Sequence, residues 1–130
     1  GQSKVYGVRI IIGERTAGAV ADSFALIELD RLRVKGKTLP ERIFGLLGDD
    51  TMKDAADFTR LKESNHTMRV AYTHQDWDVA REACDLLEAH ARVLNVDLTG
   101  YLDLYRRRIS TFAENSPGPD WDGTYTADSK

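Results

Sequence analysis

The feature that most constrains the fold is a change in the spacing of apolar residues near Gly48. Before that point the apolar residues come in dense or alternating runs, which are typical of β-strands. After it they recur at intervals of three and four residues, as on one face of an α-helix. A set of strands followed by a set of helices indicates the α+β class. We therefore expect a sheet in residues 1–48, an all-helical extension in residues 49–115 and a Pro- and Gly-rich tail in residues 116–130.

The first half predicts a strand, a short helix and a β-hairpin. Residues 8–12 are rich in β-branched side chains and predict a buried strand. Small apolar residues at helical spacing predict about two turns of helix in residues 14–20. Residues 24–34 alternate between apolar and charged, with a shift near Asp30 that indicates a β-bulge. A turn at Gly36 then leads into a second strand in residues 41–47.

The second half predicts helices. One begins at Asp50 or Thr51, where an N-cap side chain is available, and runs to about residue 60. Residues 62–73 are either a helix or a loop, because residues 64–67 are poor helix formers. Apolar stripes predict an amphipathic helix in residues 77–94 and another that begins near residue 98, and the two should pack as an antiparallel pair.

Composition limits the classes of function. The 130 residues are 42% hydrophobic with a formal charge of -3, and no stretch approaches the roughly 20 apolar residues that span a bilayer. We therefore expect no membrane contact from this segment. Residues 106–108 are the only basic run, so no nucleic-acid partner is expected. The single cysteine, Cys84, excludes an intramolecular disulfide, suits the cytoplasm and is expected to be buried and inert.

Other side chains of chemical interest have ordinary structural explanations. The three histidines lack metal-ligand spacing, and the acidic residues near Asp49 and Asp76 are explained as helix caps. No residue is therefore assigned to a metal. Arg106, Arg107 and Arg108 are expected to form a solvated face with carboxylates such as Glu114. Trp121 lies in a tail without a core of its own, so it should dock on the helical pair or on a second subunit.

One stretch resembles a known family. Leu29-Asp30-Arg31-Leu32-Arg33-Val34-Lys35-Gly36-Lys37, followed by Pro40-Glu41-Arg42-Ile43-Phe44, is similar to the closing hairpin of class III adenylate and guanylate cyclases. Residues 4–8 and 12–16 resemble the strand and short helix that precede this hairpin, in the same order. Residues 75–80, 101–102 and 119–123 resemble the helical tail of bacterial members. The resemblance thus extends in register over nearly the whole chain.

The resemblance implies a lyase that converts ATP, or less readily GTP, to the cyclic 3′,5′ nucleotide and pyrophosphate for intracellular signalling. It implies that Lys35 contacts the substrate triphosphate, although Lys37 could take that role instead. In the complete enzyme, Mg²⁺ or Mn²⁺ is held by aspartates that would lie upstream of Gly1, as would the Asn and Arg that stabilise the transition state. No catalytic residue is therefore assigned within this chain, and the fragment alone is expected to bind no cofactor and to be inactive.

The family also implies a dimer. A partial sheet with an exposed edge and an uncovered apolar face predicts a homodimer or a domain-swapped oligomer for the isolated chain. The rival interpretation is a non-enzymatic interaction or dimerisation module, because residues 77–105, with a possible preceding helix from Lys62, loosely resemble one tetratricopeptide-like helical hairpin. A single repeat of that kind cannot bury its own faces, since about three are usually needed.

Overall fold

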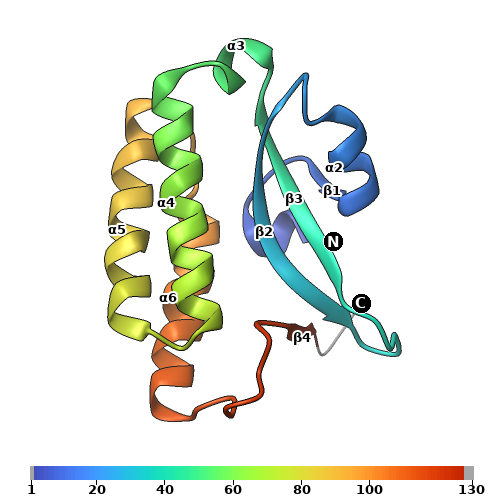
Figure 1. The fold of residues 1–130 in the computed structure, drawn as a ribbon, viewed down its shortest axis with the longest axis vertical. Helices are drawn as coiled ribbons and strands as arrows, with labels where there is room; N and C mark the ends of the chain where they lie inside the picture. Colours follow the sequence, from blue (N-terminus) through green and yellow to red (C-terminus); the bar gives the residue numbers. More distant parts are fainter. Residues whose placement is uncertain (1, 128–130) are drawn as a thin grey trace.

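The computed structural model describes residues 2–127 and has a sheet on one side and a layer of long helices on the other (Figure 1). This arrangement confirms the α+β class. The elements in order are α1 (Gln2–Tyr6), β1 (Ile11–Gly13), α2 (Glu14–Val20), β2 (Ala25–Val34), β3 (Glu41–Gly48), α3 (Asp50–Lys53), α4 (Ala56–Thr73), α5 (Trp77–Val93), α6 (Thr99–Glu114) and β4 (Tyr125–Ala127).

The sheet is mixed, with the strand order β1-β3-β2-β4. β3 pairs antiparallel with both β1 and β2, and β4 pairs parallel with the end of β2. The register of β2 against β3 shifts between Glu28 and Asp30, which confirms the predicted bulge. The bulge turns the side chain of Asp30 into the protein, where it is completely buried. Gly36 makes the hairpin turn with φ +90°, a conformation that favours glycine.

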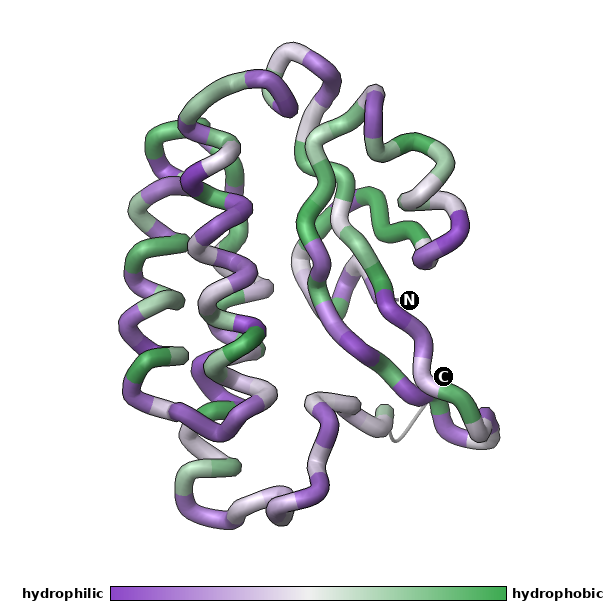
Figure 2. The backbone as a smooth tube through the Cα atoms, viewed as in Figure 1, coloured by the Kyte–Doolittle hydropathy of each residue, from purple (hydrophilic) through white to green (hydrophobic). Residues whose placement is uncertain are grey.

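Three long helices cover the β2 side of the sheet, and α2 lies on the other side (Figure 1). The Asp49 side chain caps α3 by accepting hydrogen bonds from the backbone N–H groups of Thr51 and Met52. Residues 62–73 form a regular part of α4, whereas the sequence was compatible with either a helix or a loop there. Residues 64–67 are helical despite their low helix propensity, because Asn65 makes tertiary hydrogen bonds that are described below. Hydrophilic and hydrophobic residues alternate along α4, α5 and α6 (Figure 2).

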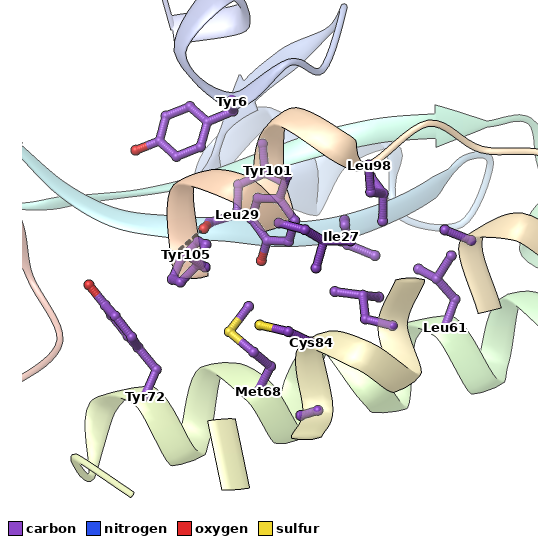
Figure 3. Packing of buried hydrophobic residues seen from close by; sticks show 14 of the residues in the cluster. Tyr6, Ile27, Leu29, Leu61, Met68, Tyr72, Cys84, Leu98, Tyr101 and Tyr105 are labelled. Carbon is purple, nitrogen blue, oxygen red and sulfur yellow. Dashed lines mark hydrogen bonds between the residues drawn. The ribbon is translucent and has the colours of Figure 1, made fainter. Parts of the chain in front are cut away.

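A single hydrophobic core joins the sheet to the helices. Ile27 and Leu29 of β2 face Met68 of α4 and Cys84 of α5, with the tyrosines of α6 beside them (Figure 3). Cys84 is fully buried as expected, and burial raises the pKa of its thiol to about 11. The predicted segment boundary at residue 48 therefore separates two kinds of secondary structure that share one core.

One local expectation was wrong and another was confirmed. The first strand is shorter than residues 8–12 and only half-buried, because Val8 packs into the core from the preceding loop and pairing begins at Ile11. In the tail, Trp121 docks against the helices as expected, with its ring centroid 5.0 Å from Tyr72 and 5.2 Å from Phe112. The chain then forms β4, which the sequence did not predict.

Within residues 2–127, no helix is long and apolar enough to cross a membrane.

Candidate functional site

The hairpin that joins β2 to β3 carries the lysine singled out by the sequence. Lys35 and Lys37 flank Gly36, and the turn is closed by a 2.9 Å hydrogen bond from the Lys37 backbone N–H to the Val34 carbonyl oxygen. Both lysines are exposed. Among the described residues, neither side chain forms an ion pair within 4.0 Å. The hairpin therefore presents two free ammonium groups at the end of a strand that is anchored elsewhere.

The anchor of that strand is the buried carboxylate of Asp30. Its Oδ2 atom accepts hydrogen bonds from the Tyr6 hydroxyl at 2.5 Å and from Arg108 Nη1 at 2.8 Å. Its Oδ1 atom lies 2.9 Å from the Arg31 backbone nitrogen and 3.1 Å from the Tyr105 hydroxyl. The groups come from α1, β2 and α6, so one carboxylate connects the first and the last helix of the described residues to β2. A buried charge is tolerated only when it is paired and hydrogen-bonded in this way.

Helix side chains also cover the edge of β2 beside Asp30. The carbonyl oxygen of Glu28 accepts hydrogen bonds from Asn65 at 2.8 Å and from the Tyr101 hydroxyl at 3.3 Å. Arg69 Nη1 donates to the Leu29 carbonyl oxygen at 3.2 Å, and the Tyr105 hydroxyl lies 2.6 Å from the same oxygen. The expectation of an exposed edge and an uncovered apolar face is therefore wrong on this side of the sheet. Self-association of the chain stays a prediction.

The C-terminal strand completes this cover. Tyr125 of β4 pairs with Leu32, and the Arg108 guanidinium lies 3.6 Å from the centroid of the Tyr125 ring. Arg31 Nε donates to the Thr124 hydroxyl at 3.0 Å. The prediction that Arg106, Arg107 and Arg108 share a solvated face with Glu114 is wrong for Arg108, which is buried against Asp30. Arg106 instead pairs with Asp85 and Glu88 of α5, and Arg107 is exposed.

The protonation states follow from these contacts. Burial alone would lower the pKa of Arg108, but the Asp30 carboxylate and the nearby tyrosine oxygens raise it, so the guanidinium stays charged. Burial and the Asp30 charge both raise the pKa of Tyr6, which keeps its hydroxyl as a donor. Arg108 is thus a charged partner for the Asp30 carboxylate, and the Tyr6 hydroxyl beside it stays neutral.

A separate pocket of about 400 Å³ lies between α2, the sheet and α4. Glu28 is one of the residues that line it, and its carboxylate accepts hydrogen bonds from Arg42 Nη2 at 2.9 Å and Nε at 3.1 Å. Arg42 Nη1 also donates to Glu14 of α2 at 2.6 Å. Burial would raise the pKa of Glu28, but the hydrogen bonds from Arg42 and the charge of Arg69 outweigh it and lower the pKa below its ordinary value. Lys35 is not among the residues that line this pocket.

The structure thus separates three features, the exposed lysines, the buried Asp30 cluster and the Glu28 pocket. In residues 2–127, no three His, Cys, Asp or Glu side chains are grouped as metal ligands. Sequence reasoning missed Asp30 and Arg108 as partners because they are 78 positions apart. The one available signal was the bulge, since a charged residue at a register shift can point inward.

No family model, curated protein or solved structure matched this chain.

Proposed function

We propose that this chain is the C-terminal part of a class III nucleotide cyclase, whose complete form converts ATP, or less readily GTP, to the cyclic 3′,5′ nucleotide and pyrophosphate. The observation that carries the proposal is the exposed Lys35-Gly36-Lys37 turn at the end of a strand, short helix and hairpin. This order is the one expected from the resemblance, except that residues 4–6, which were compared with the family's strand, lie in helix α1 and the strand begins only at Ile11. It is supported by the unpaired state of both lysines, which leaves them available to an anionic substrate.

The proposed role of Lys35 follows from the charge that develops in the reaction. Attack of the 3′ hydroxyl on the α-phosphate expels pyrophosphate, so negative charge grows on the leaving group. A positioned ammonium stabilises that charge more in the transition state than in the ground state. Asp30 holds β2 five residues before Lys35, and β4 pairs with Leu32–Val34 immediately before it. The hairpin base is therefore rigid, which favours electrostatic stabilisation by a preorganised group.

The described residues do not fit a metal site, because no suitable group of ligands is present. In the proposed enzyme the ligands of Mg²⁺ or Mn²⁺ would lie upstream of Gly1, together with the transition-state Asn and Arg. Lys35 is the one functional residue that we assign within this chain, and the chain alone is proposed to be inactive. Losing the remaining machinery removes several orders of magnitude in rate.

The rival proposal, a free-standing helical interaction module, is less well supported. Tyr101 and Tyr105 of α6 are fully buried and bond to β2, so α6 needs the sheet to satisfy its polar groups. A helical repeat unit would instead bury that face on neighbouring repeats.

The test is cyclic nucleotide production by a longer chain that extends upstream through a complete catalytic domain, assayed with Mn²⁺ and ATP or GTP. We expect Lys35→Ala to lower kcat on the order of 10²-fold, as for loss of one charge-stabilising donor. Lys37→Ala distinguishes the two lysines of the turn, and Lys62→Ala on the exposed side of α4 is the matched control. A longer chain that is inert with both nucleotides would overturn the proposal. Full activity of both Lys35→Ala and Lys37→Ala would contradict the proposed contact of these lysines with the phosphates, but not the proposed cyclase activity.

A further inference from the structure

Helix α5 carries an apolar stripe that nothing in the described chain covers. Val79, Leu86 and Val93 are spaced by seven residues, so they lie along one line of the helix. Their exposed fractions are 40%, 57% and 65%, whereas the residues of α5 that face the core are buried. The helix is the outermost element, on the side of the bundle away from the sheet (Figure 1). Single exposed apolar residues are ordinary, but three on one line at heptad spacing are typical of a helix interface.

We propose that the α5 helices of two copies of this chain pack antiparallel about a twofold axis at Leu86. The inference goes beyond the proposed enzyme activity and does not depend on it. A twofold contact is self-complementary, so the residue n positions before Leu86 faces the residue n positions after it. Leu86 then meets Leu86 of the second copy, and Val79 meets Val93 at both ends. The three large exposed apolar residues of α5 are thereby covered.

The charges beside the stripe favour this orientation. Glu82 lies four residues before Leu86 and His90 four residues after it, so antiparallel packing places each Glu82 carboxylate beside an imidazole of the other copy. Neither side chain has an ion pair in residues 2–127. Parallel packing would instead place Glu82 beside Glu82, which is unfavourable. The acidic first turn of the helix, with Asp78, would also meet itself.

The surface beside Val79 has a place for the incoming side chain. A shallow hollow of about 390 Å³ lies there, with an apolar part made by Val70, Ala71 and Val79 and a polar part made by His66, Thr67, His74 and Asp76. Val70 is 43% exposed and widens the apolar surface at this end. Val93 of the second copy would lie over this hollow, once at each end of the pair. The contact would join α4 and α5 of both copies into a four-helix arrangement, in which such antiparallel packing is common.

The first test is sedimentation of the full chain over a wide range of protein concentration. We expect a monomer–dimer equilibrium, and we expect Leu86→Glu to raise the dimer Kd about 100-fold or more, because two like charges then meet on the axis. Leu39→Glu is the matched control, since Leu39 is 76% exposed on the hairpin loop and lies outside the stripe. Circular dichroism checks that both variants remain folded. A native chain that is monomeric throughout, or a dimer that survives Leu86→Glu, would overturn the proposal.

The second test probes first the contact at Leu86 and then the orientation of the two helices. Under mild oxidation Leu86→Cys should give a covalent dimer, whereas Leu39→Cys and the native chain, whose Cys84 is buried, should not. Glu82→Lys should weaken the dimer, and adding His90→Glu should restore it, because the exchanged charges still face each other only in the antiparallel arrangement. No recovery in the double variant, or equal crosslinking of Leu39→Cys, would contradict the proposed packing.

Discussion

At the scale of single residues, Asp30 determines how the two halves of the molecule meet. Its carboxylate is completely buried and is bonded to Tyr6 and Arg108. A buried ion pair contributes little compared with an apolar pair of similar size, because both charges lose their hydration. Removing only one partner of the pair is costly, however, because the remaining charge cannot return to water without opening the core.

Asp30→Asn should therefore destabilise the chain by about 3–5 kcal/mol, the range measured when one partner of a buried pair is removed. Urea unfolding followed by circular dichroism measures this change. Asp57→Asn is the matched control, since Asp57 pairs with Arg60 on the exposed side of α4, and it should change the stability by less than about 0.5 kcal/mol. Equal effects of the two substitutions would show that Arg108 finds another partner.

Glu28 predicts a pH dependence of stability. The hydrogen bonds and charges of its arginine partners lower its pKa in the folded state below the ordinary 4.5. Its contribution to stability is therefore present above pH 4.5 and is lost as the pH falls through the lowered pKa. Glu28→Gln should flatten the dependence of the urea midpoint on pH in this acidic range. Glu63→Gln, at an exposed position of α4, should leave it unchanged, and similar curves for both variants would contradict the assignment.

At the scale of elements, the start of α6 lies directly against the loop after α1. A Cβ atom added at Gly100 would lie 3.1 Å from the Gly7 Cα atom and 3.4 Å from the Tyr6 carbonyl oxygen. Gly7 has φ +66°, so its backbone is also in a conformation that favours glycine. The two glycines allow α1 and α6 to approach closely enough for Tyr6 and Arg108 to share Asp30.

Gly100→Ala should destabilise the chain by about 1–3 kcal/mol, because the added methyl group meets backbone atoms that cannot move aside. Gly18→Ala is the matched control within α2, where a Cβ atom has no neighbour within 4 Å. That change should stabilise the chain by about 0.5–1 kcal/mol, through helix propensity and the unfolded state. Thermal unfolding measures both. The prediction fails if the two alanines shift the melting temperature in the same direction.

The elements also show what the sequence could predict. Local patterns were sufficient for α2, the β2–β3 hairpin, its bulge and the amphipathic helices, because each depends on residues close together in the chain. β4 was not predicted, since three residues after a Pro- and Gly-rich stretch become a strand only through pairing with β2. Arg108 was assigned to solvent because its neighbours Arg106 and Arg107 are basic, and no local pattern reveals a partner 78 positions away. The exposed lysines could be singled out only through the resemblance.

At the scale of the whole molecule, the shared core implies one cooperative unit. Residues of β2, α4, α5 and α6 belong to the same buried cluster. The strands therefore need the helices, and the helices need the strands, to bury their apolar faces. Unfolding should be close to two-state, as for most small single domains.

Two probes test this cooperativity. Trp77 and Trp121 pack together among the helices, so their fluorescence reports on the helical side. Hydrogen exchange at amide groups of β3 reports on the sheet. We expect the two to give the same unfolding free energy and the same urea dependence. An earlier transition in either probe would instead indicate that residues 1–48 and the helical extension unfold as separate domains.

The late position of β4 has a consequence for biosynthesis. Arg31 in β2 bonds to Thr124, 93 residues further along the chain, and the edge of β2 is also covered by side chains of α4 and α6. At a synthesis rate of roughly 5–20 residues per second, β2 leaves the ribosome roughly 5–20 s before its last neighbour exists. During that interval an open strand edge is available to other nascent chains. We therefore expect the newly made chain to aggregate more readily than its finished form, which has that edge closed.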